Sequence, residues 1–479
     1  MSSVNAITID SPVAPNLMLR AAIFLALLSA FGLILGAAGG DLWLDEIWSV
    51  DLARMVHSSW DVFVLRHENN HPLNTLYLYL LGDPKALLEY RLAAIVSGAA
   101  CISLIGYTAW KQWGEREALL SIILTAASFP ILLYSTEARG YSMVMMLAVA
   151  AYVAWRQHLK SSGVASLLMF WSASVLGLLA QGTFVIVMIA FALGQIAEEH
   201  SPSFRQRVSS LVKTHAVPML FAAGWYFFFL SRLINGGGNP SGGWPIIGQA
   251  SALLLGLSDT PAFHLVAMAG VLAILVIGVI YQWRAREGQW LFFLSVLLIA
   301  PAILLAFSYP HDFYVRYFLA SFPFFLLLSS RLVCLGWKRF GTGGRCLLAL
   351  ALTVFFSGNI QRDYFLLKFG RGQYSQAIEY MLRQTPHGQV RVGSDHDFRN
   401  PVVLRFYASR LPGGDRLVYV DEAHCEELQP EWFLLHSQDL NYVPSPEIGV
   451  DKVGTYSLVK RYGFAGISGW RWFLYRRSG

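Results

Sequence analysis

Long apolar runs recur along most of this 479-residue chain, and they limit its possible folds more than any other feature. A run of about 20 apolar residues can cross the hydrocarbon core of a membrane as a helix. Only 14% of the residues are charged, against about 25% in an ordinary soluble domain. The sequence therefore predicts an all-α polytopic membrane protein with about 11 transmembrane helices. The runs lie at 17–39, 91–110, 117–135, 141–156, 163–180, 183–198, 215–231, 262–282, 289–308, 316–335 and 345–362.

Basic residues alternate between the connections of these runs, and this alternation predicts their orientation. Every second connection is rich in Lys and Arg, which is typical of cytoplasmic loops. We therefore expect a cytoplasmic N-terminus and a C-terminus outside the membrane. The net charge of +6 is then mostly an orientation signal, and nucleic-acid binding is not expected. The basic connections are 111–116, 156–160, 205–213, 284–286 and 331–345.

The polar segments divide the rest of the chain. We predict a transmembrane domain over 1–362, with a long first outer loop at 40–90, and a small α/β domain outside the membrane over 371–479. Within the first loop, residues 46–56 have helical apolar spacing, which predicts a short amphipathic helix at the membrane interface. A second outer loop, at about 232–261, is polar and rich in glycine. In the C-terminal domain, the segment from Tyr374 is predicted to be a helix that ends before Pro386, and 388–394 and 415–422 are predicted to be strands.

Titratable side chains gather at the outer ends of the predicted spans, whose centres carry almost no charge. This pattern favours a site at the outer membrane surface. A transporter of lipid or ions would instead place charges and broken helices at mid-depth. The clustered residues are Asp41, Asp45, Glu46, His67, Glu68, His71, Glu137, Arg139, Tyr141, His311, Asp312 and Arg316.

Two adjacent carboxylates, Asp45 and Glu46, follow the first apolar run between Trp43 and Trp48. Asp45 fits the N-cap of a helix, with Glu46 near the positive end of the helix dipole. The same pair also fits a general base with a neighbouring carboxylate, since two carboxylates near aromatic rings differ in proton affinity. Both interpretations stay open at this stage.

The other clustered residues have structural alternatives as well. The segment "HENNH" at 67–71 matches the zinc-protease pattern, but Pro72 disfavours a helix at His71, so a structural His71 capping the next helix is preferred. Glu137 and Arg139 fit a pair that solvates a tight turn. Arg316 fits either a snorkelling side chain or a clamp for phosphate, which a guanidinium binds through two hydrogen bonds.

Four segments resemble the polyprenyl-phosphate-sugar-dependent glycosyltransferases with the GT-C fold, the group that contains protein O-mannosyltransferases and lipid A aminoarabinose transferases. The resemblance covers about 1–360, and the C-terminal domain only loosely. The segments are "LDEIWSVDLAR" at 44–54, "HPLNTLYLYLL" at 71–81 with "YRLAAIVSG" at 90–98, "YSTEARGYSM" at 134–143, and "RYFLASFP" at 316–323.

The resemblance implies a role for each site residue. Asp45 becomes the catalytic acid–base residue with Glu46 beside it. The residues implied to bind or organise the substrates are His71, Glu137, Arg139, Tyr141, Arg316 and Tyr317, with Arg316 on the lipid-linked phosphate. The family often has His-Pro-Pro-Leu where this chain has His71-Pro72-Leu73, which weakens the assignment of His71. No metal ligand is assigned. A divalent metal is left open, because some relatives bind one near this loop and Asp45, Glu68, His71 and His311 offer donor atoms.

The function implied by the resemblance is the transfer of a sugar from a polyprenyl phosphate to an acceptor hydroxyl, with inversion at the anomeric carbon. The acceptor would be a glycan, a lipid or a protein. We expect the enzyme in the bacterial inner membrane, among membrane lipids, with its site and its C-terminal domain in the periplasm. The alternative is a transporter or flippase of a lipid-linked sugar.

Overall fold

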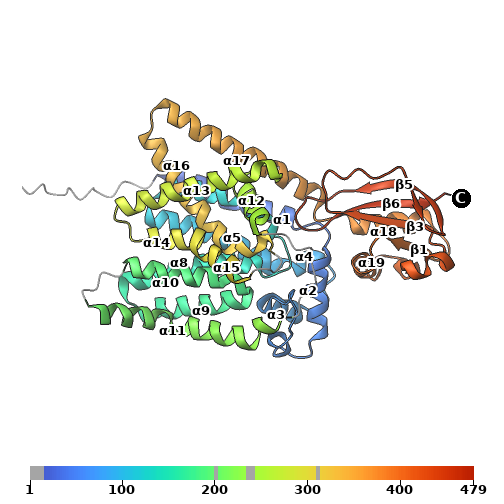
Figure 1. The fold of residues 1–479 in the computed structure, drawn as a ribbon, viewed down its shortest axis with the longest axis horizontal. Helices are drawn as coiled ribbons and strands as arrows, with labels where there is room; N and C mark the ends of the chain where they lie inside the picture. The colour runs from blue at the N-terminus through green and yellow to red at the C-terminus, as the bar shows by residue number, and fades with distance from the viewer. Residues whose placement is uncertain (1–15, 199–202, 234–242, 309–312, 479) are drawn as a thin grey trace, which may run out of the picture.

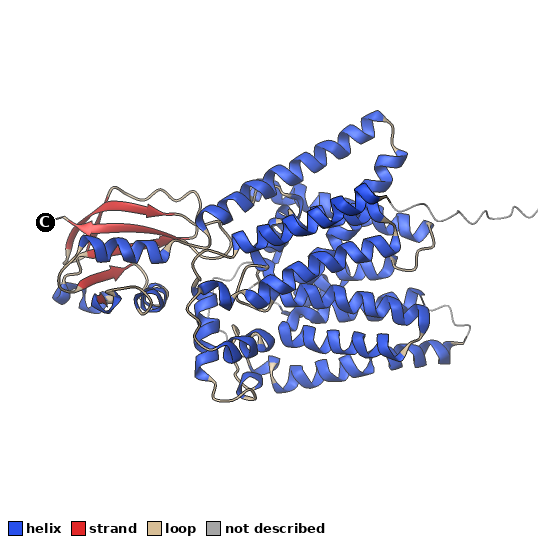
Figure 2. Ribbon diagram, turned by 180° about the vertical axis from the view of Figure 1, so that it is seen from behind, coloured by secondary structure: helices blue, strands red, loops and turns tan. Residues whose placement is uncertain are grey.

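A long bundle of helices and a small mixed α/β domain make up the protein (Figure 1). The computed structural model describes residues 16–198, 203–233, 243–308 and 313–478. The domain is attached at one end of the bundle, and the short helices of the first outer loop lie at that same end (Figures 1 and 2). The expected all-α membrane part with a small α/β domain is confirmed.

Each of the expected apolar runs is helical. By length and composition, five helices in the described part of the chain can cross a membrane, and four shorter helices are also apolar. The number of spans therefore stays a prediction. The bundle helices are α1 (Leu17–Ala37), α5 (Leu92–Gln112), α6 (Glu115–Ala126), α7 (Phe129–Tyr134), α8 (Tyr141–Ser161), α9 (Val164–Ala180), α10 (Val185–Glu198), α11 (Phe204–Phe228), α13 (Pro261–Arg284), α14 (Trp290–Leu294), α15 (Ala300–Ser308), α16 (Phe322–Arg339) and α17 (Thr342–Phe369).

Some of the expected runs are not continuous α-helices. The run at 117–135 breaks into α6 and α7 near Pro130. At the break, the backbone N–H of Phe129 donates to Oδ1 of Asn359 on α17 at 2.8 Å. Proline cannot continue the hydrogen-bond ladder of a helix, so the break follows from the sequence. The run at 289–308 contains a π-helical turn at Ser295–Ile299, between α14 and α15.

The outer loops contain more helix than expected. The first loop holds α2 (Leu44–Met55), α3 (Pro72–Leu81) and α4 (Leu87–Tyr90). The predicted amphipathic helix is confirmed as α2, but it is mostly buried between the bundle and the α/β domain. The second loop was described from the sequence as polar and rich in glycine, and it contains a helix that was not predicted, α12 (Gly243–Leu255), whose buried Ile246, Ala250 and Leu253 follow helical spacing. Most of its glycine-rich stretch lies outside the described residues.

The C-terminal domain is built on a six-stranded mixed sheet. The order is β2-β1-β3-β6-β5-β4, in which β2, β1 and β3 are parallel and the other pairings are antiparallel. The predicted helix and both predicted strands are confirmed as α18, β1 and β2. The elements are α18 (Tyr374–Gln384), β1 (Val390–Ser394), α19 (Asn400–Ala408), β2 (Leu417–Tyr419), α20 (Cys425–Leu428), β3 (Trp432–Ser437), β4 (Glu447–Val450), β5 (Gly454–Tyr462) and β6 (Arg471–Arg477).

A single apolar cluster joins α2 to the C-terminal domain. Ile47 of α2 belongs to the same buried cluster as Tyr374 of α18 and Trp472 of β6. Polar contacts fix the chain just before α2 as well. The Asp41 carboxylate accepts hydrogen bonds from the Ser375 backbone N–H at 2.7 Å and from its hydroxyl at 2.9 Å. The position of α2 is therefore set by the bundle and the domain together.

Candidate active site

The first turn of α2 presents Asp45 and Glu46 in different directions. Trp43, not Asp45, is the N-cap, and the Trp43 backbone N–H donates to Glu46 Oε2 at 3.2 Å. Of the two interpretations left open for Asp45, the N-cap is therefore wrong, because the helix begins one residue before it, at Leu44. Consecutive residues are about 100° apart around a helix axis, so the two side chains enter different surroundings.

Glu46 lies in a fully buried ion pair with Arg91. Arg91 Nε donates to Glu46 Oε1 at 2.7 Å and Arg91 Nη2 donates to Oε2 at 2.6 Å, and both side chains are 0% exposed. The Ala138 backbone N–H also donates to Oε1, at 2.8 Å. Arg91 Nη1 donates to the carbonyl oxygens of Ala38 and Gly40, which follow the end of α1. This pair ties α1, α2, α5 and the 135–140 turn into one unit.

Glu137 is the second buried carboxylate beside this pair. The Trp43 indole N–H donates to Glu137 Oε1 at 2.6 Å, and Arg371 Nε lies 3.6 Å from the same oxygen. One interpretation left open by the sequence was that Glu137 and Arg139 pair with each other. They do not, because the Glu137 side chain turns toward Trp43 and Arg371 and the Arg139 side chain turns toward Asp45. We call Glu46, Arg91, Glu137 and Arg371 the buried ion-pair cluster.

The two carboxyl groups of this cluster differ in proton affinity. Burial acts to raise the pKa of Glu46, but the charges of Arg91 and Arg371 outweigh it and hold that pKa below its ordinary value. Burial dominates at Glu137, and its pKa is raised although the charges of Arg371 and Arg139 oppose the shift. The two buried carboxyl groups therefore have pKa values shifted in opposite directions, because their charged partners differ.

Asp45 faces a second set of charges and is partly open. Arg139 Nη1 donates to Asp45 Oδ2 at 2.5 Å, and Arg316 Nη1 reaches the same oxygen at 3.2 Å. The Asp45 side chain is 11% exposed. Both hydrogen bonds that the Asp45 side chain accepts from described residues go to Oδ2, so Oδ1 is left free by them. We call Asp45, Arg139 and Arg316 the Asp45 site.

The two arginines of the Asp45 site are held in place by their neighbours. Arg139 Nη2 donates to Asn69 Oδ1 at 2.5 Å, and its guanidinium lies 4.8 Å from the centre of the Tyr141 ring. The Arg316 guanidinium lies 4.1 Å from the centre of the Tyr314 ring and is 19% exposed. Arg316 therefore turns inward to Asp45. A snorkelling side chain would instead extend toward water.

His71 lies beside this site but does not cap a helix with its side chain. It occupies the N-cap position of α3 without a side-chain capping bond, because its Nδ1 lies 3.0 Å from the Ala180 carbonyl oxygen instead. A carbonyl only accepts, so Nδ1 carries the proton and Nε2 is an acceptor. Burial lowers the pKa of His71 well below its ordinary value, and the nearby charge of Arg139 adds to this effect, which keeps the ring neutral.

The remaining predicted residues line the same region. Tyr141 is buried and packs edge-on against His71, with ring centres 5.0 Å apart. Tyr317 packs against Tyr314 at 5.7 Å. His67 and His71 are joined by turns and not by a helix, so the two rings of the zinc-protease pattern do not share a helical face.

The described donor atoms of this site are not arranged as the ligands of a metal ion. Among the described residues, no three His, Cys, Asp or Glu side chains are grouped so that they could hold one. Two guanidinium groups approach Asp45 Oδ2, and their positive charges disfavour a cation beside this carboxylate. His311, a proposed ligand, and Asp312 lie outside the described residues. The chemistry considered below therefore uses only side chains of the chain.

Sequence reasoning missed several residues of the site. Arg91 and Arg371 complete the buried ion-pair cluster, Trp43 binds Glu137, and Asn69 positions Arg139. A signal was present for Arg91, which directly precedes a long apolar run, since a charge in such a place needs a partner. No comparable signal marks Arg371, which lies 234 residues after the carboxylate that it approaches.

Comparisons with known proteins establish the fold. No protein-family model and no curated protein matches the chain. The structure of ArnT from Cupriavidus metallidurans in the apo state is similar, with a TM-score of 0.51 and 14% identity over 95% of this chain and 98% of that chain. The oligosaccharyltransferase of Archaeoglobus fulgidus in the apo form gives a TM-score of 0.53 and 12% identity over 88% of this chain and 69% of that chain. The predicted GT-C fold is confirmed.

Proposed function

We propose that this protein is an integral-membrane glycosyltransferase that moves a sugar from a polyprenyl phosphate to an acceptor hydroxyl. The observation that carries the proposal is the Asp45 site. One oxygen of the carboxylate is held by two guanidinium groups and the other is free to accept a hydrogen bond. The fold shared with two solved transferases, and the four sequence segments quoted above, support the same assignment.

The geometry suggests how the acceptor is activated. The two donors on Asp45 Oδ2 fix the orientation of the carboxyl group and leave Oδ1 available to a substrate. Asp45 Oδ1 takes the proton of the acceptor hydroxyl, and the acceptor oxygen attacks the anomeric carbon of the donor. The bond from that carbon to the phosphate oxygen breaks, polyprenyl phosphate leaves with the electron pair, and the anomeric centre is inverted.

Arg316 is suited to the leaving phosphate. Its guanidinium is partly exposed and borders Asp45, so a phosphate next to the base would lie within its reach. A preorganised cation at the position of developing negative charge lowers the barrier. Arg139 is buried and contacts Asp45, the Asn69 side chain and the Tyr141 ring. We assign it a positioning role, in which it orients Asp45.

Unpartnered polar atoms around Asp45 indicate a polar ligand. Asn69 Nδ2, His71 Nε2 and Arg139 Nε are buried and have no protein hydrogen-bond partner among the described residues. Leaving such atoms unpaired costs about 1–3 kcal/mol each, so a ligand or water is expected to satisfy them. Two of these atoms are donors and His71 Nε2 is an acceptor, a mixture that suits the hydroxyl groups of a sugar.

The transporter alternative has less support. The buried charges described above gather at one end of the bundle, and a conduit would need them along its length. The π-helical turn at Ser295–Ile299 is a broken helix of the kind found in transporters, but none of its residues is charged.

We further propose that the site faces the periplasm of a bacterial cell, with the C-terminal domain on that side. Nucleotide sugars are cytosolic, so a site outside requires a sugar that is already activated on a membrane lipid. A C-terminal alkaline phosphatase fusion should be active in cells, and a C-terminal green fluorescent protein exported by the general secretory route should be dark. The reverse pattern would overturn the proposed orientation.

Mass analysis of bound lipid tests the proposed donor. The purified full-length protein is incubated with vesicles that contain undecaprenyl phosphate, re-isolated and extracted. The extract should be enriched in that lipid relative to the bulk phospholipid, and Arg316→Ala should lose the enrichment. Arg345→Ala is the matched control and should keep the enrichment, because Arg345 lies in the first turn of α17, at the end of that helix away from the C-terminal domain. Equal lipid content in all three proteins would contradict the proposed donor.

A further inference from the structure

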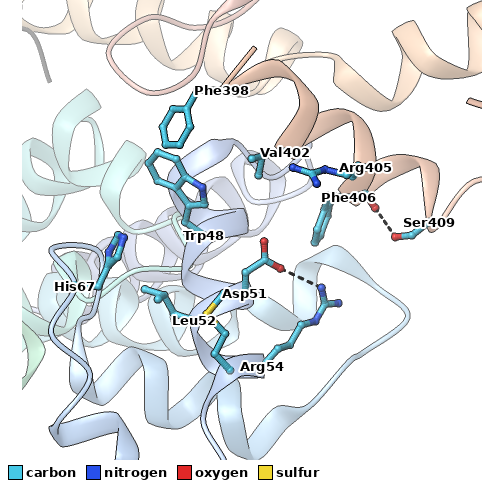
Figure 3. A pocket seen from close by; sticks show the side chains of 11 residues that line it. Trp48, Asp51, Leu52, Arg54, His67, Phe398, Val402, Arg405, Phe406 and Ser409 are labelled. Carbon is cyan, nitrogen blue, oxygen red and sulfur yellow. Dashed lines mark hydrogen bonds and ion pairs between the residues drawn. The ribbon is translucent and has the colours of Figure 1, made fainter. Parts of the chain in front are cut away.

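A cleft of about 570 Å³ separates α2 from α19 of the C-terminal domain, and the proposed mechanism assigns it no role. Figure 3 shows that its wall combines aromatic rings with charged side chains. Pockets of about 300–1,000 Å³ are typical of small-molecule sites. The residues that line the α2–α19 cleft are Trp48, Asp51, Leu52, Arg54, Met55, His67, Phe398, Val402, Arg405, Phe406 and Ser409.

The α2–α19 cleft borders the Asp45 site. Trp48 and Leu52 follow Asp45 by three and seven residues on α2, so these three side chains share one face of the helix. A second connection runs through His67, whose Nδ1 accepts from the Asn69 backbone N–H at 3.1 Å. The Asn69 side chain in turn binds Arg139 of the Asp45 site. A molecule in the cleft can therefore extend toward Asp45.

The wall on the domain side is a fixed loop and not a mobile one. The loop follows β1, at the carboxyl edge of the parallel strands, which is where α/β domains usually bind ligands. Asp395 holds it by accepting from the His436 backbone N–H at 3.1 Å and from Asn400 Nδ2 at 3.2 Å. This loop presents Phe398, which is 55% exposed, above Trp48 (Figure 3).

The chemistry of the cleft matches a sugar. Trp48 and Phe398 have ring centres 5.4 Å apart and offer flat apolar surfaces, on which the C–H face of a sugar ring can pack. Asp51 offers acceptor oxygens, and the hydrogen bond that Arg405 makes to a described residue goes from its Nε to a backbone carbonyl. The third charged group, Arg54, is already engaged by Asp51 at 3.2 Å and by Asp83 at 2.8 Å. The mixture of both charge signs suits a polyhydroxyl ligand better than an anion.

We propose that the α2–α19 cleft binds the acceptor, and that this acceptor is a saccharide. The inference rests on the proposed function and adds the class of acceptor, for which glycan, lipid and protein were left open. Trp48 and Phe398 hold one sugar ring, Asp51 and Arg405 bind its hydroxyl groups, and the reacting hydroxyl points along α2 to Asp45 Oδ1.

Photo-crosslinking in living cells tests this assignment on the full-length protein. The photoreactive amino acid p-benzoylphenylalanine replaces Phe398, and in a control strain it replaces Val459, an exposed residue of β5 outside the cleft. After irradiation, adducts are analysed by mass spectrometry and by periodate–hydrazide labelling of carbohydrate. The substitution at Phe398 should give a saccharide-bearing adduct without polyprenyl phosphate, enriched at least about tenfold over the Val459 control.

The other outcomes overturn the proposal. A peptide adduct would make the acceptor a protein, a polyprenyl adduct would make the cleft part of the donor site, and no enrichment over the control would show that the cleft binds no ligand.

Sugar-transfer assays in native membranes add an independent readout. Trp48→Ala and Phe398→Ala should lower transfer at limiting acceptor by at least about tenfold while donor-lipid binding stays unchanged. Val459→Ala should change neither transfer nor donor-lipid binding.

Failure of this inference can be told apart from failure of the proposed function. The crosslink at Phe398 should persist in the Asp45→Asn variant, because that change removes the base and not the cleft. Normal transfer in Asp45→Asn would contradict the catalytic role, whatever the adduct. A protein adduct, together with inactive Asp45→Asn, would contradict the saccharide acceptor alone.

Discussion

The buried ion-pair cluster and the Asp45 site begin at adjacent residues of α2, yet they use their charges differently. In the cluster, both oxygens of Glu46 are bound, Oε1 by Arg91 and Ala138 and Oε2 by Arg91 and Trp43. At the Asp45 site, both arginines meet one oxygen and the other remains free. A carboxylate with every position filled holds the fold together, whereas one with a free oxygen can take a proton. The difference assigns structure to Glu46 and chemistry to Asp45.

Breaking the buried ion-pair cluster should have the largest effect on stability. Arg91→Met leaves Glu46 charged and unpaired in a fully buried place, which typically costs about 3–5 kcal/mol. The melting temperature in detergent should fall accordingly. In the double variant Glu46→Leu with Arg91→Met, much of the loss should return, because no charge is left buried. A single variant as stable as the natural protein would show that this pair does not support the fold.

Changing Arg316 should affect binding and leave the fold intact. Arg316→Lys keeps a positive charge but loses the planar guanidinium, so affinity for the donor lipid should fall by about 1.5–3 kcal/mol. The melting temperature should stay close to that of the natural protein, since Arg316 lies at the open site. Lipid binding is measured by titration with undecaprenyl phosphate in nanodiscs. Arg345→Lys serves as the control, and equal affinities would return Arg316 to a snorkelling role.

Acidification should separate the two carboxyl groups of the buried ion-pair cluster. The pKa of Glu46 is below its ordinary value of 4.5, so its stabilising effect is complete above pH 4.5 and is lost as the pH falls through the folded-state pKa. The advantage in melting temperature of the natural protein over Glu46→Gln should therefore shrink on acidification. The pKa of Glu137 is raised, so against Glu137→Gln the natural protein should gain as the pH falls toward 4.5. If the natural protein changed in the same direction relative to Glu46→Gln and to Glu137→Gln, the opposite pKa shifts of the two carboxyl groups would be contradicted.

An exposed ion pair provides the smallest expected effect. Lys452 and Glu426 are 3.2 Å apart on the surface of the C-terminal domain, and both side chains are about two-thirds exposed. Surface pairs usually contribute about 0–1 kcal/mol. Lys452→Ala should therefore leave the melting temperature nearly unchanged and should lose no sugar transfer. A loss comparable to that of Arg91→Met would mean that burial does not explain the difference between the regions.

The parts of the fold that depend on local pattern were predictable. The apolar runs, α2, α18 and the first two strands follow from composition and periodicity over short windows. The helix α12 was missed because glycine and proline around it suggested an irregular loop, although its apolar spacing is helical. The start of α2 was placed two residues too late, and the open interpretation of Asp45 as its N-cap does not hold. Helix ends are set by backbone contacts, which composition does not reveal.

The sequence predicted which residues form the site better than it predicted which of them contact each other. Asp45, Arg139 and Arg316 were all singled out, and they lie together. Their contacts span long stretches of chain, so no local rule decides whether Arg139 turns to Glu137 or to Asp45. The partner of Glu46 was missed for the same reason, because Arg91 lies 45 residues away, at the start of another helix.

Turnover of Asp45→Asn is the most direct measurement of the central claim. The variant keeps the shape of the side chain and a carbonyl oxygen for the two arginines, but it cannot take up a proton at neutral pH. Transfer from a polyprenyl-phosphate sugar in native membranes should fall by about 10²–10⁴, the usual contribution of a general base. The melting temperature should stay near that of the natural protein, and the Lys452→Ala variant should be fully active. Near-normal transfer by a folded Asp45→Asn protein would contradict the assignment of Asp45 as the base.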